Sequence, residues 1–284
     1  MSSIWRPVRE RAPARSLMVI VAHPGDEAFG FGGAIAGAAA SGAYVVVVCV
    51  TRGWFDARLT TSPPAAGGKN RDVKSGAINW RNIDTVREDE LRRSVALLGV
   101  RVVRMLDYAE GDLDRENFDN LVGRIVEPIR MHRPEVIVSF GPDGATGDTD
   151  HMVLSRAVRA AYDRAAEPLS YEDDLEEDQV AWRAAKLYEL VVPQSALAAF
   201  GDRLPVEGYG SAVEPTVALE LGELAQLKLA AISRHVSQIG SVGAFHDWGS
   251  DRRDAWLGTE HYRLAASALP MPVDGEASLF DGLP

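Results

Sequence analysis

The feature that most constrains the fold is a series of short, continuous apolar runs that alternate with segments of helical periodicity. Apolar runs without polar alternation are typical of strands buried on both faces of a sheet. Helices are predicted between the runs. Strands that alternate with helices form βαβ units, so the sequence predicts an α/β, Rossmann-like three-layer fold with a mostly parallel sheet. The strand runs are 16–22, 43–51, 101–106, 135–140 and 186–192, and the helices are 30–41, 84–98, 115–132 and 150–166.

The remaining segments depart from this alternation. Beyond residue 211 we predict a helix over 221–238 and an aromatic-rich tail. We interpret residues 1–284 as one domain, with a core of about 16–240 and a C-terminal extension over 241–284. The stretch 52–82 contains Gly and Pro and is too long for an ordinary connection, so it is predicted to cover a site as a lid.

Composition excludes several classes of function. The chain has 30 basic and 41 acidic residues, a net charge of −11, and no basic run, which disfavours nucleic acid as a partner. No apolar stretch has the length of a membrane span or the form of a signal peptide, so we expect no membrane association and a cytoplasmic protein. A single cysteine, Cys49, lies in an apolar run and predicts neither disulfides nor a thiolate metal site. Homo-oligomerisation is left open.

Two polar clusters follow predicted strands. His23 and Asp26 come directly after the first strand, and His151 lies in the segment after the strand 135–140. Open α/β sheets bind ligands at the carboxyl ends of their strands, and these two strands can be neighbours. Two imidazoles and a carboxylate suit a divalent metal, with Zn²⁺ the most natural choice and Fe²⁺ or Mn²⁺ also compatible.

The glycine-rich segment 29–33 raises a second hypothesis, a dinucleotide-binding loop. The full spacing of that motif is absent, and no acidic residue ends the second strand to hold a ribose. We therefore interpret these glycines as allowing close packing of the first helix.

The motifs together resemble the PIG-L/LmbE-like family of metal-dependent de-N-acetylases. The resemblance covers about residues 16–240, and its motifs are 22–27, 29–33, 87–91, 141–151 and 228–238. It implies a hydrolase that removes an acyl group from a small N-acyl amino sugar or related amide. It further implies that His23, Asp26 and His151 hold zinc and that Arg87 contacts the substrate.

Two residues depart from the family pattern. Gly25 stands where the usual general base, an aspartate, would be, and Asp148 stands where a catalytic histidine would be. We expect Asp148 to take over the acid–base role, with Glu27 as a weaker candidate. The alternative is a non-catalytic metal- or sugar-binding relative. Trp54, in the long segment, is a candidate for stacking on a sugar.

Overall fold

The computed structural model describes residues 15–53, 82–171, 180–197, 213–238, 249–270 and 275–284. The sheet of these residues has seven strands in the order β3-β2-β1-β4-β5-β7-β6. Strands β1 to β5 are parallel, which confirms the predicted core of the fold. The strands are β1 Ser16–Val21, β2 Tyr44–Thr51, β3 Val102–Tyr108, β4 Val136–Phe140, β5 Lys186–Val191, β6 Val217–Glu220 and β7 Thr259–Ser267.

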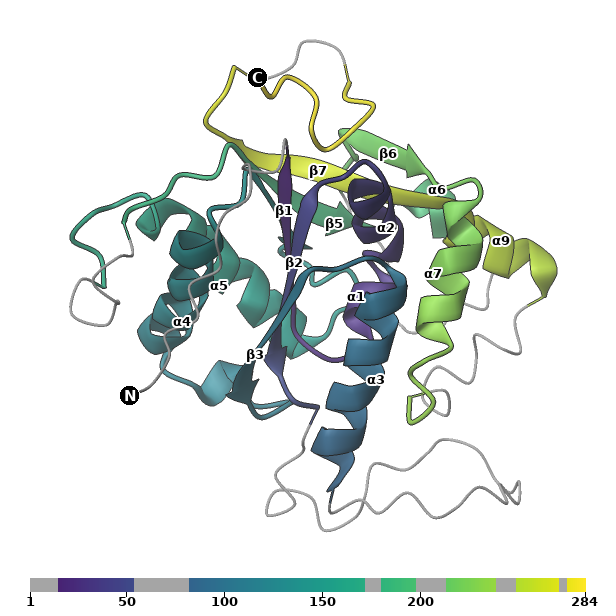
Figure 1. The fold of residues 1–284 in the computed structure, drawn as a ribbon, viewed down its shortest axis with the longest axis horizontal. Coiled ribbons are helices and arrows are strands. Elements are labelled where there is room, and N and C mark those ends of the chain that lie inside the picture. Colours follow the sequence, from purple (N-terminus) through teal and green to yellow (C-terminus); the bar gives the residue numbers. More distant parts are fainter. Residues whose placement is uncertain (1–14, 54–81, 172–179, 198–212, 239–248, 271–274) are drawn as a thin grey trace, which may run out of the picture.

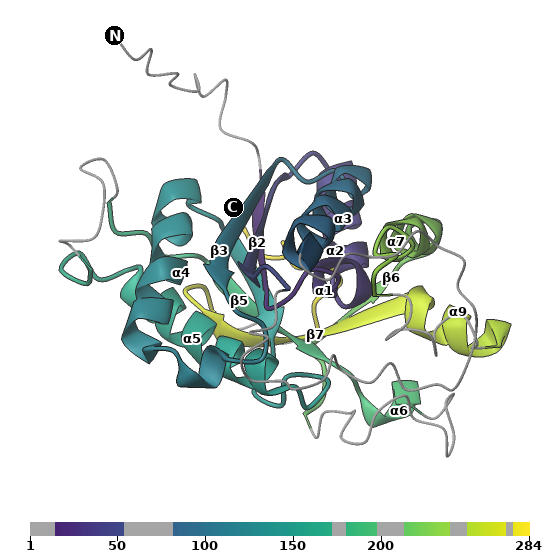
Figure 2. The ribbon, with the colours of Figure 1, turned by 90° about the horizontal axis from the view of Figure 1, so that it is seen from below.

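Helices cover both faces of the sheet, so the molecule has three layers. In Figures 1 and 2, α4 and α5 lie on one face, while α1, α2, α3 and α7 lie on the other. The predicted helix 30–41 corresponds to α2, which begins at Gly32. A separate short helix that the sequence did not predict, α1, precedes it and ends where the N–H of Gly30 bonds to Asp26 O. The helices are α1 Asp26–Phe29, α2 Gly32–Ala40, α3 Ile83–Leu97, η2 Leu113–Arg115, α4 Phe118–His132, α5 Thr149–Arg164, α6 Gln194–Leu197, α7 Leu224–Ile232 and α9 Ser250–Gly258.

The central strands owe their position to unbroken burial. Every residue of β4 and β5 is buried, and β1 and β2 are buried except at their first residue. β-branched residues make up half or more of β1, β2 and β4 and suit a sheet covered by helices on both faces. Cys49 is buried in this core. Among the described helices, none combines the length and apolarity needed to cross a membrane.

The C-terminal part of the chain extends the sheet, which the sequence did not predict. Strand β7, from the predicted extension, lies between β5 and β6 and is antiparallel to both. After β7 the chain returns along the sheet, where Glu276 pairs with the buried Lys186 of β5. Tyr188 of β5 donates a further hydrogen bond of 2.6 Å to the same carboxylate. The extension therefore contributes directly to the sheet and its core.

A buried carboxylate from β7 occupies the start of the glycine-rich helix α2. Glu260 accepts hydrogen bonds from the backbone N–H of Gly33 (2.7 Å) and Ala34 (2.8 Å). Lys228 of α7 lies 2.7 Å from the same carboxylate. A helix N-terminus of this kind is where nucleotide-binding folds hold a phosphate. Here the protein's own side chain takes that position, consistent with the rejection of a dinucleotide site.

Candidate metal centre

The pairing of β1 with β4 brings the two predicted polar clusters together. Strands β1 and β4 are parallel neighbours, so the segments after their carboxyl ends meet at one edge of the sheet. His23 follows β1, and His151 lies in the first turn of α5, which follows β4. The Nδ1 atom of His23 lies 3.2 Å from the Nε2 atom of His151. Two imidazoles separated by 127 intervening residues thus face each other, as expected from the sequence.

Hydrogen bonds on the far side of each ring determine which nitrogen is free. Nε2 of His23 lies 3.0 Å from a carboxylate oxygen of Asp150. Nδ1 of His151 lies 3.1 Å from the carbonyl oxygen of Gly144 and 3.0 Å from the hydroxyl oxygen of Thr146. Carboxylates and carbonyls only accept, and a hydroxyl can also accept, so these two nitrogens carry the protons in the neutral rings. His23 Nδ1 and His151 Nε2 are then two lone pairs that face each other, an arrangement a bound cation satisfies.

Asp26 adds the third donor to this pair. Its Oδ2 atom lies 3.3 Å from His151 Nε2 and 3.6 Å from His23 Nδ1. Donors at 2.0–2.1 Å from a tetrahedral zinc lie about 3.3 Å from one another, so the three separations fit such an ion. Phe140 stacks on the His151 ring with centroids 3.9 Å apart, which fixes the ring plane. The three residues therefore fit the metal that the sequence predicts.

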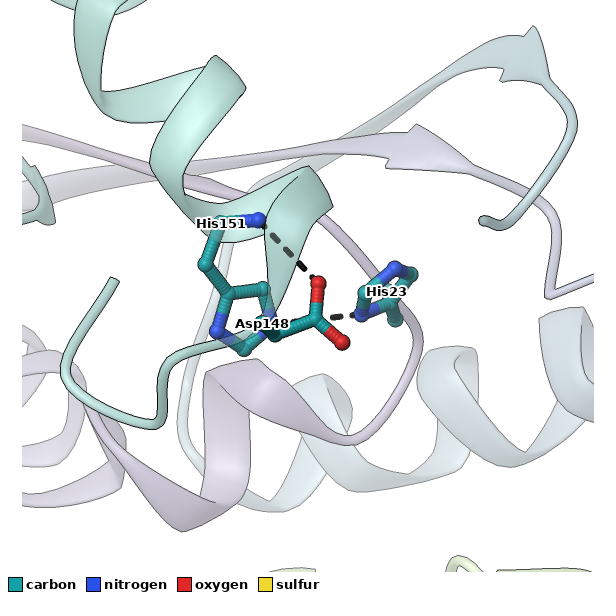
Figure 3. Close-up of side chains that lie close together, drawn as sticks. All are labelled: His23, Asp148 and His151. Atoms are coloured by element: carbon teal, nitrogen blue, oxygen red, sulfur yellow. Dashed lines mark hydrogen bonds between the residues drawn. The ribbon is translucent and has the colours of Figure 1, made fainter. Parts of the chain in front are cut away.

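Asp148 is a second carboxylate beside the two histidines. It is exposed, and its ligand atom lies within 4.8 Å of those of His23 and His151. Its Oδ1 atom accepts hydrogen bonds from the N–H of Asp150 (2.8 Å) and His151 (3.3 Å), so Asp148 is the N-cap of α5. Figure 3 shows its carboxylate directed toward the two rings. Between the two carboxylates, Asp26 has the shorter contacts with the imidazole nitrogens, at 3.3 and 3.6 Å.

In the metal-free protein, the surroundings of His23 and Asp26 favour the charged form of each side chain. In the metal-free protein burial opposes protonation of His23, but the hydrogen bond with Asp150 and the charge of Asp26 outweigh it and raise its pKa to about 9. Burial likewise opposes ionisation of Asp26, and the neighbouring His151 and His23 lower its pKa to about 2. The metal-free centre thus holds opposite charges close together, and a metal that binds there displaces protons from the histidines.

Asp150 is the residue of this centre that sequence reasoning missed. Its side chain is 1% exposed and accepts from the backbone N–H of Gly111 (2.6 Å) and Leu113 (3.1 Å), besides its contact with His23. A carboxylate behind a metal-binding histidine fixes the tautomer and orientation of the ring. Its position directly before His151 was the available signal, but it became meaningful only when the fold brought His23 to it.

Glu27 lies in a separate buried network. Its side chain is fully buried, and its oxygens contact Ser94 Oγ (2.6 Å), His235 Nε2 (2.6 Å) and the N–H of Gly25 (2.7 Å). Both oxygens are thus engaged by the protein. This arrangement holds the loop between β1 and α1 and connects it to the segment after α7.

Arg87 ties three strand-end loops together. It is buried, and its guanidinium donates to Gly53 O after β2 (3.0 Å) and to Pro24 O after β1 (3.3 Å). It also pairs with Glu110, after β3. Its position thus borders the predicted site. Trp54 and nearly all of the predicted lid at 52–82 lie outside the described residues.

Comparison with known proteins identifies relatives along most of the chain. A family model described as PIG-L, GlcNAc-PI de-N-acetylase, matches residues 18–162. A protein of Geodermatophilus obscurus named 1D-myo-inositol 2-acetamido-2-deoxy-alpha-D-glucopyranoside deacetylase is 30% identical, over 96% of this chain and 99% of its own length.

Solved structures share the fold at lower identity. N,N'-diacetylchitobiose deacetylase from Pyrococcus horikoshii has a TM-score of 0.61 at 18% identity, covering 88% of this chain and 83% of its own. A 4-carboxy-2-hydroxymuconate hydratase from Pseudomonas putida has a TM-score of 0.60 at 18% identity, covering 93% of this chain and all of its own. Since one fold serves a deacetylase and a hydratase, the fold alone does not determine the reaction.

Proposed function

Since the chain belongs to the PIG-L family of GlcNAc-PI de-N-acetylases, we propose that it is a metal-dependent hydrolase of N-acyl amino sugars or related amides. The observation that carries this proposal is the triangle of donors at His23, Asp26 and His151, with separations of 3.2, 3.3 and 3.6 Å. We propose zinc as the metal, because two imidazoles and one carboxylate are typical of catalytic zinc sites, although this set also accepts Fe²⁺ or Mn²⁺. Bound there, a divalent metal polarises a carbonyl and lowers the pKa of water.

The chain's own residues must then move protons. Hydrolysis joins the water oxygen to the acyl carbon, breaks the C–N bond, and delivers a proton to the amine. We propose Asp148 as a group that takes a proton from water and returns it. Its Oδ1 atom is held by the start of α5, so the carboxylate has a fixed direction beside the donors.

The other predicted site residues receive supporting roles in this proposal. Glu27 positions the β1–α1 loop, because both of its oxygens already have partners within the protein. Arg87 fixes the three strand-end loops that border the metal donors, and so shapes the region where the substrate binds. Direct contact of Arg87 with the sugar is a second part of its proposed role.

Acetate release tests the function directly. The purified protein is stripped of metal with a chelator, restored with Zn²⁺, and incubated with a panel of N-acetyl sugars. The first sugar of the panel is 2-acetamido-2-deoxy-glucosyl inositol, the compound after which the similar deacetylase of Geodermatophilus obscurus is named. We expect turnover only after metal is restored. Metal binding without acetate release from any member of the panel would instead favour the non-catalytic relative, which the absence of a side chain at Gly25 makes a specific second candidate.

Asp148→Asn tests the acid–base assignment. Asn remains a good N-cap, so α5 and His151 stay in place, but the amide cannot take a proton. We expect kcat to fall by about 10²–10⁴-fold with zinc content unchanged. Asp163→Asn, an exposed carboxylate farther along α5, is the matched control. Full activity in Asp148→Asn would remove Asp148 from the mechanism.

A further inference from the structure

His235, in the turn after α7, is a buried histidine with only one side of its ring engaged. The side chain is 4% exposed, and Nε2 lies 2.6 Å from Glu27 Oε1. The Glu27 carboxylate oxygen accepts this hydrogen bond, so Nε2 carries the proton in the neutral ring. Ser94 and the N–H of Gly25 hold the same carboxylate in place. The imidazole is therefore oriented by a carboxylate that is itself fixed.

The other nitrogen of this ring points toward Gly25. Nδ1 of His235 is buried and has no hydrogen-bond partner among the described residues. A Cβ placed on Gly25 would lie 3.9 Å from Nδ1 and from Cγ of His235, and no other described atom outside its chain neighbours comes within 4 Å. Leaving a buried acceptor without a partner costs about 1–3 kcal/mol, so a polar partner on this side is favoured.

The loop between β1 and α1 connects the space beside Gly25 to the donor triangle of His23, Asp26 and His151. Gly25 lies two residues after His23 and directly before Asp26. Because Gly25 has no side chain, the space that a Cβ would fill separates His235 Nδ1 from the backbone that joins these two donors. A carboxylate-held imidazole with a free second nitrogen is the arrangement of an oriented general base.

We propose that His235, held by Glu27, is a second acid–base group of this site: Asp148 takes one proton of the hydrolytic water, and His235 accepts the other through the space beside Gly25. The proposal rests on the proposed function. As the water oxygen joins the acyl carbon, one O–H bond breaks and its proton goes to Asp148; the second O–H proton goes to Nδ1 of His235 as the C–N bond breaks. The amine nitrogen takes up both protons, so Asp148 and His235 return to their starting forms and acetate and an ammonium group are released.

The charges around His235 set the sign of its pH dependence. Burial disfavours the charged ring, and Glu27 of α1 together with Glu90 of α3 outweighs burial and raises its pKa, against the opposing charge of Arg87. A base acts in its deprotonated form, so kcat should rise with pH through the pKa of His235. Glu27→Gln should move this acidic limb to lower pH, because a neutral amide no longer favours the imidazolium.

His235→Gln in the zinc-loaded enzyme tests the proposal. The Gln amide can still donate to Glu27 but has no basic nitrogen. We expect kcat to fall by about 10²–10⁴-fold, the acidic limb of the pH profile to disappear, and zinc content and KM to stay near those of the wild type. His261→Gln, on β7, is the control and should keep the wild-type profile. A merely structural role would not remove the limb.

Nitrogen NMR of the wild-type ring gives a readout that does not depend on activity or on the folding of a variant. We expect the Nε2–H tautomer of His235, with Nδ1 unprotonated, once the ring is neutral. A neutral ring protonated on Nδ1, or an unchanged acidic limb in His235→Gln, would overturn the proposal while leaving the hydrolase function standing. An inactive zinc-loaded wild type would overturn the hydrolase function, and the role of His235 with it.

Discussion

Replacing Asp150 by Asn tests whether the metal centre depends on the carboxylate behind His23. Oδ2 of Asp150 faces two donors, His23 Nε2 at 3.0 Å and Gly111 N–H at 2.6 Å, and Oδ1 faces Leu113 N–H at 3.1 Å. An amide has one accepting oxygen and one donating nitrogen. With its oxygen at the Oδ2 position, Asn keeps two of these bonds and turns its NH₂ group against Leu113 N–H.

The magnitude follows from this inventory. One buried hydrogen bond is lost and two donors face each other, which costs about 1–3 kcal/mol of stability in the metal-free protein. For a chain of this size, that lowers Tm by roughly 2–4 °C per kcal/mol. The His23 ring also loses its charged partner, and the loss of such a partner weakens metal affinity by about 10–100-fold, or roughly 1.4–2.7 kcal/mol.

Two measurements on one preparation check both effects. Thermal unfolding without metal reports the hydrogen-bond loss, and titration of zinc against a competing chelator reports the affinity. Asp163→Asn, exposed on the same helix, should match the wild type in both assays. If Asp150→Asn kept the wild-type Tm and zinc affinity, Asp150 would not orient His23 and our reading of the tautomers would be wrong.

The remaining predictions concern the proposed metal ligands His23 and His151 and the loop residue Gly25. His23→Ala and His151→Ala should each abolish zinc retention, measured by elemental analysis, because too few protein donors remain; normal metal content in both would remove the assignment. In the metal-free protein the pKa of His23 is raised from an ordinary value near 6.5 to about 9. Protonated His23 therefore stabilises the fold fully below about pH 6.5, and this stabilisation is lost as the pH rises through 9. Tm of the metal-free wild type should therefore fall over that range more than that of His23→Gln. Gly25→Asp should cost about 1–3 kcal/mol in denaturant unfolding, since φ at Gly25 is +113°, where side chains are strained; an unchanged midpoint would show that the loop adopts another conformation.

The sequence predicted the parallel half of the sheet because its strands carry their own signal. β1, β2 and β4 are buried along nearly their whole length, so each appears as a mainly apolar run in the sequence. Strand β7 has no such run, because its buried positions alternate with less buried ones and include the charged Glu260. The partners that make this charge compatible with burial, Lys228 and the first N–H groups of α2, come from other parts of the sequence.

The same distinction separates the site residues that the sequence predicts from those that it does not. His23, Asp26 and His151 follow strands and belong to recognisable motifs, so sequence alone named them as donors. Asp150 and His235 contact residues 127 and 208 positions away in the sequence, His23 and Glu27 respectively. No periodicity or spacing carries such a contact, because the order of strands in the sheet decides it.

The position of β7 has a consequence for synthesis of the chain. A nascent chain that has emerged only as far as β5 has one edge of its sheet uncovered, and the N–H groups that begin α2 lack the carboxylate of Glu260. Both deficits persist until residues near the C-terminus leave the ribosome, more than 200 residues after α2 itself. Exposed strand edges attract other chains. The protein should therefore depend on chaperones late in translation, and ribosome-bound chains that stop short of β7 should be protease-sensitive throughout the sheet.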